Sequence, residues 1–340
     1  MKKIIDPIPV ELIKAELTEA RKLMDTNKGG NELYVIDCNN APNTLREIGR
    51  IREVAYRAAG GCSGNEVDLD EYDFLEKPYQ QLIVWDPDAC AIIGGYRFLL
   101  GKDVTFGEDG QPVISSSHLF HYSDKFIKDY LPKSMELGRS FVAPEYQSSK
   151  AGARALFTMD NLWDGITGVL LCHPDVDYFF GKMTIYKSYD KAARELIMRF
   201  LEKHFADSEE LVRPFKHLKY SSDPRIIDII LKEDDLKADL RCLKSALHQL
   251  GTGIPPLVNS YINTSSKMKI FGSAVNDELS GAIETGLMIK FSEIYSDKVE
   301  RHIRTFIEKR VPRLRNIRIR RHKAVEAASP TMSDIFSNNP

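Results

Sequence analysis

The stretch Ser134–Phe157, SMELGRSFVAPEYQSSKAGARALF, has the pattern of a strand that turns into a helix. We expect a strand over residues 134–143, ended by Pro144, and a helix that begins among the small residues after Gln147. The first turn of a helix presents unpaired N–H groups and the positive end of its dipole, so a phosphate could bind there. A plain helix start with serine caps explains the same residues equally well.

Glu136 and Arg139 lie three residues apart within this strand. On a regular strand their side chains face opposite ways, and only a β-bulge between them would bring both to one face. Gly138 suits a bulge because glycine tolerates distorted backbone. A bulge would also splay the strand from its neighbour and open a cleft for an extended ligand arm. Without a bulge, Glu136 is a surface residue with Arg139 as its exposed partner.

The remaining sequence alternates helical and strand patterns, which predicts a mixed α/β sheet covered by helices on both faces. A helix over 43–61, capped by Asn43 and ended by Gly60 and Gly61, is expected before a β-hairpin. The expected organisation is an N-terminal helical arm (1–30), a core (31–205), a helical insertion (206–250), C-terminal strands that complete the core (251–300) and a basic, partly disordered helix or tail (301–340).

Three carboxylates, Asp68, Asp70 and Asp73, lie in an acidic loop before the hairpin. They could bind a hard cation, although the EF-hand pattern is absent, or bind an amine, or organise arginines. Arg52 and Arg97 are the expected partners, because a charge on a core strand needs a counter-ion. A buried salt-bridge network is the structural alternative. The eight histidines show no metal-ligand spacing, so no metal site is predicted.

Composition excludes several classes of protein. The net charge of −2 gives no electrostatic preference for nucleic acid, and the five scattered cysteines argue against a disulfide framework or a zinc knuckle. No apolar run approaches the ~20 residues of a membrane span, and the start has no signal-peptide pattern. We therefore expect a cytoplasmic protein. The segment 309–323, KRVPRLRNIRIRRHK, is strongly basic and has no acidic residue.

The segment VAPEYQSSKAGA resembles the acyl-donor loop of the GNAT acyltransferase superfamily, V-x-P-x-x-[QR]-x-x-G-x-[GA], with Lys150 where the first glycine is usual. The segments RIREVAYRAAG, DLDEYDF, IIGGYRFLLG, MELGRSFVAPEYQ, YFFGKMTI and IPPLVNSYI occur in the order typical of the ornithine-lipid and glycine-lipid N-acyltransferase branch, also called hemolysin-like. Acyl-homoserine-lactone synthases share the Arg…Asp-x-x-Asp…Arg…Glu-x-x-Arg skeleton. The resemblance spans residues 30–295.

The resemblance implies a mainly antiparallel GNAT sheet with a V-shaped split between its fourth and fifth strands. It implies transfer of a fatty, sometimes 3-hydroxylated, acyl group from acyl carrier protein, or from coenzyme A, to the α-amine of glycine or ornithine in aminolipid synthesis, with no tightly bound cofactor. Lys150 favours a carrier-protein donor over free coenzyme A. The basic segment Arg310–Lys323 would attract an acidic carrier protein or give peripheral contact with the inner membrane surface. A solubilising tail is the alternative for that segment.

Roles follow from the matched motifs. The implied catalytic residues are Glu136, as general base toward the amine, and Arg139. Arg97 or Arg139 could hold the amino acid's carboxylate, and N–H groups freed by a bulge could stabilise the oxyanion. The implied substrate-binding residues are Arg52, Asp68, Asp70, Asp73 and Arg97. The implied donor-binding residues are Phe141, Val142, Gln147, Lys150, Ala151, Gly152 and Arg154.

Three other functions fit the same residues. One is an acetyl-coenzyme A-dependent acetyltransferase with a small substrate. Another is an S-adenosylmethionine-using enzyme like the homoserine-lactone synthases. The third is a non-catalytic GNAT-fold protein that binds or regulates a partner, in which loss of the Glu136 carboxylate would have no effect.

Overall fold

The computed structural model describes residues 1–147, 153–233 and 235–295, with the backbone alone for 153–156. Several expectations therefore lie outside the described residues. They concern Lys150, Ala151 and Gly152, the side chain of Arg154, and the basic tail (301–340) with its segment Arg310–Lys323.

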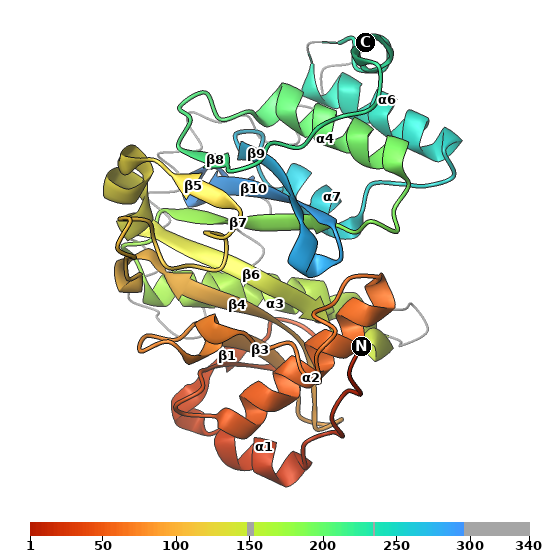
Figure 1. Cartoon of the computed structure of the whole chain (residues 1–340). Coiled ribbons are helices and arrows are strands. Elements are labelled where there is room, and N and C mark those ends of the chain that lie inside the picture. The colour runs from red at the N-terminus through yellow and green to blue at the C-terminus, as the bar shows by residue number, and fades with distance from the viewer. Residues whose placement is uncertain (148–152, 234, 296–340) are drawn as a thin grey trace.

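An eight-stranded sheet forms the centre of the molecule, in the order β1-β2-β3-β4-β6-β7-β10-β9 (Figure 1). Every neighbouring pair is antiparallel except β6 and β7, which are parallel, so the predicted mixed, mainly antiparallel sheet is confirmed. A small separate sheet pairs β5 (Phe120–Tyr122) with β8 (Val212–Pro214). The main strands are β1 (Lys22–Asp25), β2 (Glu32–Ile36), β3 (Gln80–Asp86), β4 (Ala91–Leu100), β6 (Ser134–Val142), β7 (Tyr178–Ile185), β9 (Lys269–Asn276) and β10 (Ala282–Lys290).

Helices cover both faces of the sheet, as predicted (Figure 1). Helix α2 (Pro42–Ala59) packs its apolar side on one face, where Ile48 meets residues such as Ile83 and Phe141. On the other face, α3 (Ala153–Cys172), α4 (Lys191–Phe205) and α7 (Pro256–Ile262) share one core with strand residues such as Leu82 and Met183. A third apolar cluster lies beside β5 and β8 on the α2 side of the sheet, around Phe126 and Phe180.

The ends of α2 match the sequence in part. Gly60 ends the helix in the left-handed conformation, with φ 88°, as expected. Asn43 is not the N-cap: the cap position is Ala41, followed by Pro42 in the first turn, and Asn43 donates instead to the Glu16 carboxylate. Glu16 takes over the capping role, because its carboxylate also accepts from the backbone N–H of Thr44.

Three segments differ from the secondary structure expected of them. The arm (1–30) holds one short helix, α1 (Val10–Glu16), and then the edge strand β1, whose backbone pairs with β2. The segment 206–250 begins with β8 before α5 (Pro224–Ile230) and α6 (Leu236–Gln249), because its first residues complete the ladder of β5. The segment after residue 250 carries α7 as well as strands. In each case pairing or packing with distant chain segments outweighs local pattern.

A bulge in β6 lies at Arg139 and Ser140, just beyond the predicted position between Glu136 and Arg139, because the ladder with β4 is regular up to Gly138. Gly95 pairs with Phe141 and Arg97 with Gly138, so Tyr96 alone stands opposite two residues of β6. Arg139 adopts the left-handed conformation, with φ 48°, whereas the expectation gave that distortion to Gly138. The Tyr56 hydroxyl donates to the Ser140 carbonyl and holds the bulged segment against α2.

The sheet splits beyond the first half of β6. Its ladder with β7 runs only from Ser134 to Leu137, paired with Tyr178 to Gly181. At the last pair the strands are in such close contact that a Cβ on Gly181 would lie 2.2 Å from the Leu137 carbonyl oxygen. Within the described residues, Gly138–Val142 therefore has a strand partner, β4, on one edge only. The split, expected between the fourth and fifth strands, lies between β6 and β7, the fifth and sixth strands of the main sheet, because β1 of the N-terminal arm adds an edge strand.

Candidate active site

Three arginines and three aspartates form a closed ring of alternating charge beside the bulge. Each arginine pairs with two aspartates, and each aspartate with two arginines. The pairs are Arg52–Asp68 (3.0 Å), Arg52–Asp73 (3.4 Å), Arg97–Asp73 (3.2 Å), Arg97–Asp70, Arg139–Asp70 (3.0 Å) and Arg139–Asp68. The structure thus brings together the predicted substrate-binding residues and Arg139.

Elements far apart in the sequence supply the ring. Arg52 comes from α2, Arg97 from β4 and Arg139 from the β6 bulge, while the aspartates come from the loop that precedes β3. Asp70 and Asp73 fix that loop by a reciprocal capping box around the short 3₁₀ turn Glu71–Phe74. The loop is therefore rigid, and it presents its carboxylates to all three arginines at once.

Burial makes the ring strongly interdependent. Arg52 and Arg97 are 1% exposed or less, whereas the Arg139 side chain is 28% exposed and lines the split. Burial opposes the charge of Asp70, but the positive charges of Arg97 and Arg139 outweigh it and lower the pKa of Asp70 to about 2. Burial likewise opposes ionisation of Arg97, yet its aspartate partners raise its pKa. Asp70 and Arg97 are therefore charged near neutral pH.

Glu136 lies beside the ring on the same face as Arg139. The bulge explains this, since both side chains reach the segment 68–79: Arg139 to its aspartates, Glu136 to the Tyr79 hydroxyl. Glu136 is 1% exposed. Its carboxylate also accepts from the hydroxyls of Ser115, at 3.3 Å, and Ser116. Burial, followed by the charge of Glu136, raises the pKa of Tyr79, which keeps that hydroxyl a donor.

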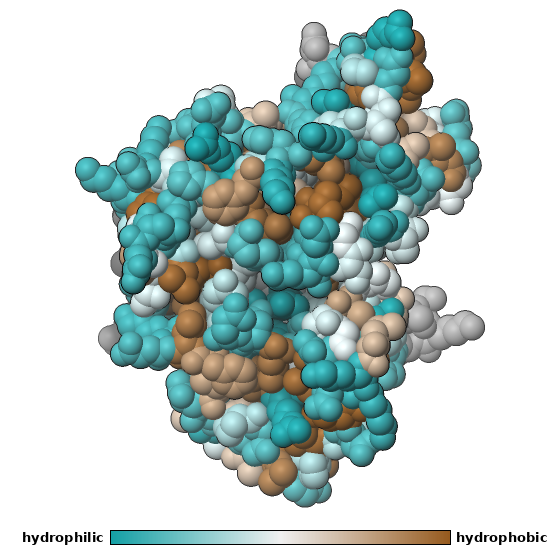
Figure 2. All heavy atoms as spheres, viewed as in Figure 1, coloured by the Kyte–Doolittle hydropathy of each residue, from teal (hydrophilic) through white to brown (hydrophobic). Residues whose placement is uncertain are grey.

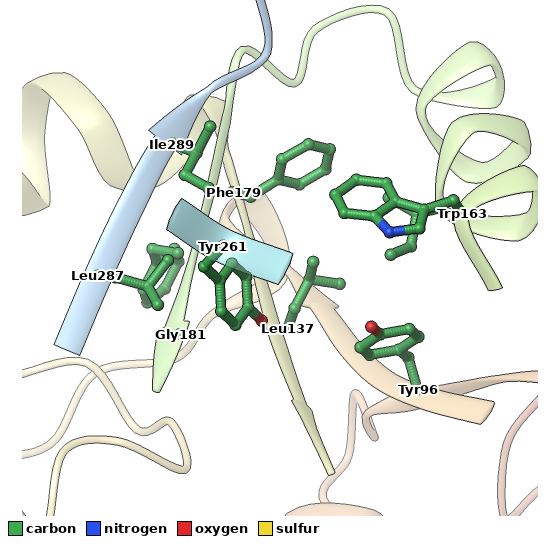
Figure 3. A pocket seen from close by; sticks show the side chains of 10 residues that line it. Tyr96, Leu137, Trp163, Phe179, Gly181, Tyr261, Leu287 and Ile289 are labelled. Carbon is green, nitrogen blue, oxygen red and sulfur yellow. The ribbon is translucent and has the colours of Figure 1, made fainter. Parts of the chain in front are cut away.

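A narrow apolar pocket lies where β6 and β7 diverge, on the α3 side of the sheet. Leu137 and Gly181, the last paired residues of the two strands, both line it. Figure 3 shows the rings of Tyr96, Trp163 and Tyr261 around its opening. The cavity has a volume of about 20 Å³, so a longer ligand would enter only as these side chains move.

The predicted donor-binding residues that the structure describes do not gather in that pocket. Phe141 is buried on the α2 side of the sheet. Val142 and Gln147 lie at the end of β6, where the Gln147 amide donates to the Val142 carbonyl at 2.7 Å. This bond fixes the turn toward α3. That these residues contact the acyl donor therefore stays a prediction.

The opposite wall of the split is polar. Lys182, the first residue of β7 beyond the ladder, pairs with Glu284 of β10 at 2.9 Å. Glu284 also accepts from the Thr184 hydroxyl (3.2 Å) and the Asn276 amide (2.9 Å). Burial opposes the charge of Glu284, but Lys182 and Asn276 outweigh it and lower its pKa. In the space-filling view, hydrophilic residues lie between the two halves of the molecule, and the outline is indented there (Figure 2).

Sequence reasoning missed these partners. Ser115 and Ser116 lie in an excursion without a recognisable motif, and Lys182 and Glu284 are single charges on strands. A charge inside an otherwise apolar strand such as YFFGKMTI was the one available signal. No group of three potential metal ligands occurs in residues 1–147, 153–233 and 235–295.

Comparison with known proteins agrees with this architecture. Residues 51–156 match the acetyltransferase (GNAT) domain family. A glycine N(alpha)-acyltransferase of Bacteroides thetaiotaomicron is 52% identical, covering 91% of each chain, and one of Phocaeicola vulgatus is 48% identical, covering 91% of this chain and 94% of that one. An L-ornithine N(alpha)-acyltransferase of Brucella abortus is 26% identical, covering 67% and 72%.

A solved structure of BjaI, a CoA-dependent acyl-homoserine lactone synthase, with SAM and isopentyl-CoA, covers 81% of this chain and 89% of its own, with 12% identity and a TM-score of 0.35. The relatives above show that the chain belongs to the GNAT N-acyltransferases, and it is an enzyme of that class, an acyltransferase. Among the helices in the described part of the chain, none has the length and apolarity that a bilayer crossing requires.

Proposed function

We propose that this enzyme transfers a fatty acyl group from a thioester on acyl carrier protein to the α-amine of glycine, as a step in aminolipid synthesis. The observation that carries the proposal is the likeness to two glycine N(alpha)-acyltransferases over nine-tenths of the chain. The likeness to the ornithine enzyme is weaker and covers less of the chain, which favours glycine over ornithine.

The two faces of the split suit the two different substrates of the proposed reaction. Its α3 face bears the apolar pocket of Leu137, Trp163 and Tyr261, which suits a fatty chain once the rings move apart. Its α2 face bears charged groups, which suit an amino acid. The thioester would lie between the two, along the edge of β6 that β7 leaves open after Leu137. N–H groups on that edge can stabilise the oxyanion formed when the amine attacks.

Glu136 is the proton acceptor in this proposal. The amine of glycine is protonated at neutral pH and must lose a proton before it attacks the thioester carbonyl carbon. Glu136 is buried, but the half-buried Ser115 hydroxyl donates to it and borders Gly138 at the split. The proton passes through that hydroxyl, or a water beside it, to the carboxylate. The C–S bond then breaks as the amide forms, and the leaving sulfur takes the second proton of the attacking nitrogen, so the carrier leaves as its thiol.

Acyl carrier protein as the donor is inferred from sequence. Lys150 replaces a glycine of the usual coenzyme A loop, and the basic segment Arg310–Lys323 complements an acidic carrier or an anionic membrane surface.

The test is an assay of the purified enzyme with glycine and either palmitoyl-acyl carrier protein, palmitoyl-coenzyme A or acetyl-coenzyme A, with the product identified by mass spectrometry. N-palmitoylglycine formed fastest from the carrier protein is the expected result. Turnover of acetyl-coenzyme A alone would identify a small-substrate acetyltransferase and refute the proposal. Product from S-adenosylmethionine instead of glycine would indicate a lactone-synthase-like activity.

A further inference from the structure

Every arginine of the charged ring already has carboxylate partners. Arg52, Arg97 and Arg139 each already face two carboxylates. A substrate carboxylate at any of them would lie close to two like charges, which opposes binding. The ring therefore shapes one wall of the split but is a poor receptor for the carboxylate of an amino acid.

Lys182 on the opposite wall differs from these arginines in the number of carboxylates that it faces. Among the described residues it faces a single carboxylate, that of Glu284. Its ammonium group has three donors, and two have partners in the described part of the chain, Glu284 and the Ser115 carbonyl at 3.1 Å. Its side chain is 14% exposed, more than the buried Arg52 and Arg97 and less than Arg139 at 28%. One N–H of Lys182 is therefore available to a ligand.

The position of Lys182 places that donor at the reaction centre. It follows Gly181, the last β7 residue paired with β6, and its side chain lies on the Glu136 face of the sheet. Ser115 joins the two walls, because its carbonyl accepts from Lys182 while its hydroxyl donates to Glu136. Lys182 and Glu136, the proposed proton acceptor, thus contact the same residue, so a molecule held by Lys182 lies close to Glu136.

Tyr186 indicates that the two walls face each other closely. After burial, the charges of Asp68 on one wall and Glu284 on the other both contribute to raising its pKa to about 12. Its ring lies against Gly61 so tightly that a Cβ there would be 2.1 Å away. The hollow beside it, about 360 Å³, is lined from both halves of the molecule, by residues such as Arg57 and Cys62 and by Asp277 and Glu278.

From these contacts we infer that Lys182 binds the carboxylate of the acceptor amino acid, while Glu284 and Asn276 position its ammonium group. The carboxylate takes the free N–H of Lys182, and the amine points toward Ser115 and the open edge of β6. Glu284 and Asn276 are positioning residues, since they reach the ligand only through Lys182. The inference rests on the proposed function, because it names the receptor for the amino acid in that reaction.

The test compares glycine with glycinamide, which keeps the amine but lacks the carboxylate. Replacing Lys182→Met removes the charge while keeping a side chain of similar length. A charge-assisted hydrogen bond of ordinary strength predicts a KM for glycine about 10- to 100-fold higher, with the KM for the acyl donor unchanged. The kinetics with glycinamide should stay near those of the wild type, so the preference for glycine over glycinamide falls by the same factor.

Lys187→Met is the matched control, because Lys187 is an exposed lysine just past β7 and outside the split. It should leave both acceptors unaffected. Wild-type turnover of glycine together with an unchanged preference in Lys182→Met would overturn the inference and leave the proposed function intact. Failure of the wild type to acylate any amino acid would instead refute the proposed function.

A second measurement needs no variant. Reductive methylation of the wild-type enzyme, read by peptide mass spectrometry, should label Lys182 more slowly in millimolar glycine than in equal glycinamide. Equal labelling in both would overturn the inference even if the Lys182→Met chain failed to fold.

Discussion

Asp70 connects the exposed and the buried part of the charged ring, because it pairs with both Arg139 and the buried Arg97. Its pKa of about 2 lies below the ordinary value of 3.8. A carboxyl whose folded-state pKa is depressed stabilises the fold above its ordinary pKa, and that stabilisation is lost as the pH falls through the folded value. The contribution of Asp70 is therefore present at pH 7 and disappears between about pH 5 and pH 2.

We predict that Asp70→Asn lowers the free energy of unfolding at pH 7 by about 2 kcal/mol, the equivalent of its pKa shift. The gap between the variant and the wild type should close as the pH is lowered toward 2. Urea unfolding curves at pH 7, 5 and 3 measure this, with Asp6→Asn, an exposed aspartate, as the control. A gap that stays constant with pH would contradict the assigned shift.

Glu136 tests the chemistry at the same scale. Glu136→Gln keeps the size of the side chain and one of the two acceptor oxygens that the Tyr79 and Ser116 hydroxyls use, but it cannot take a proton. General-base catalysis contributes about 10²- to 10⁴-fold, so kcat should fall by about that factor. The melting temperature should change far less. Steady-state kinetics and thermal unfolding provide both values.

A matched control for Glu136 is Glu195→Gln in α4, a buried carboxylate that accepts from Ser221 and Ser222 away from the split. It should cost stability without a comparable loss of kcat. Wild-type kcat in Glu136→Gln would exclude Glu136 as the proton acceptor and would favour a different base or a non-catalytic role.

At the scale of elements, the contact between β6 and β7 depends on Gly181. A methyl group there would meet the Leu137 carbonyl oxygen at 2.2 Å, and backbone cannot move aside as a flexible side chain can. Gly181→Ala should therefore destabilise the fold by about 2–3 kcal/mol, in the range typical of overpacking. Gly253→Ala, where a Cβ would meet no atom within 4 Å, should have little effect. Chemical denaturation of the two variants makes the comparison.

Elements with strong local patterns could be predicted from the sequence. Helix α2 and strand β6 lie within a few residues of their expected bounds, and the hairpin β3–β4 follows α2 in the chain as expected. A bulge near Glu136 and Arg139 was one of two alternatives that the sequence left open. Its left-handed residue could not be predicted, because the ion pairs of Arg139 with Asp68 and Asp70 hold it there.

The charged ring and the wall that carries Lys182 and Glu284 show what could not be predicted from the sequence. The members of the ring were named from their charges and motifs, but their closed alternation depends on how α2, β4 and β6 pack together. Lys182 and Glu284 are separated by a hundred residues and meet only through the pairing of β7 with β10. Edge strand β1 was likewise hidden, because its pairing with β2 and not its sequence makes it a strand.

At the scale of the whole molecule, the two faces of the split imply separate routes for the two substrates. The described site also requires no covalent intermediate, since the amine can attack the thioester directly. We therefore predict a ternary-complex mechanism, with initial-rate plots that intersect when both substrates are varied. Parallel lines, together with an isolable acyl-enzyme, would contradict it. A carrier-protein thiol product should compete with the acyl donor and not with glycine.

The parallel pair β6–β7 also divides the sheet mechanically. On one side β1, β2, β3, β4 and β6 form an unbroken antiparallel unit, and on the other β7, β10 and β9 form a second one. Within the sheet, four residue pairs join the two units. An acyl donor that fills the split would contact both units and hold them together where β6 and β7 meet. We expect hydrogen exchange of the β7 amides to slow when the donor binds, because the bound donor would stabilise the contact between the two units.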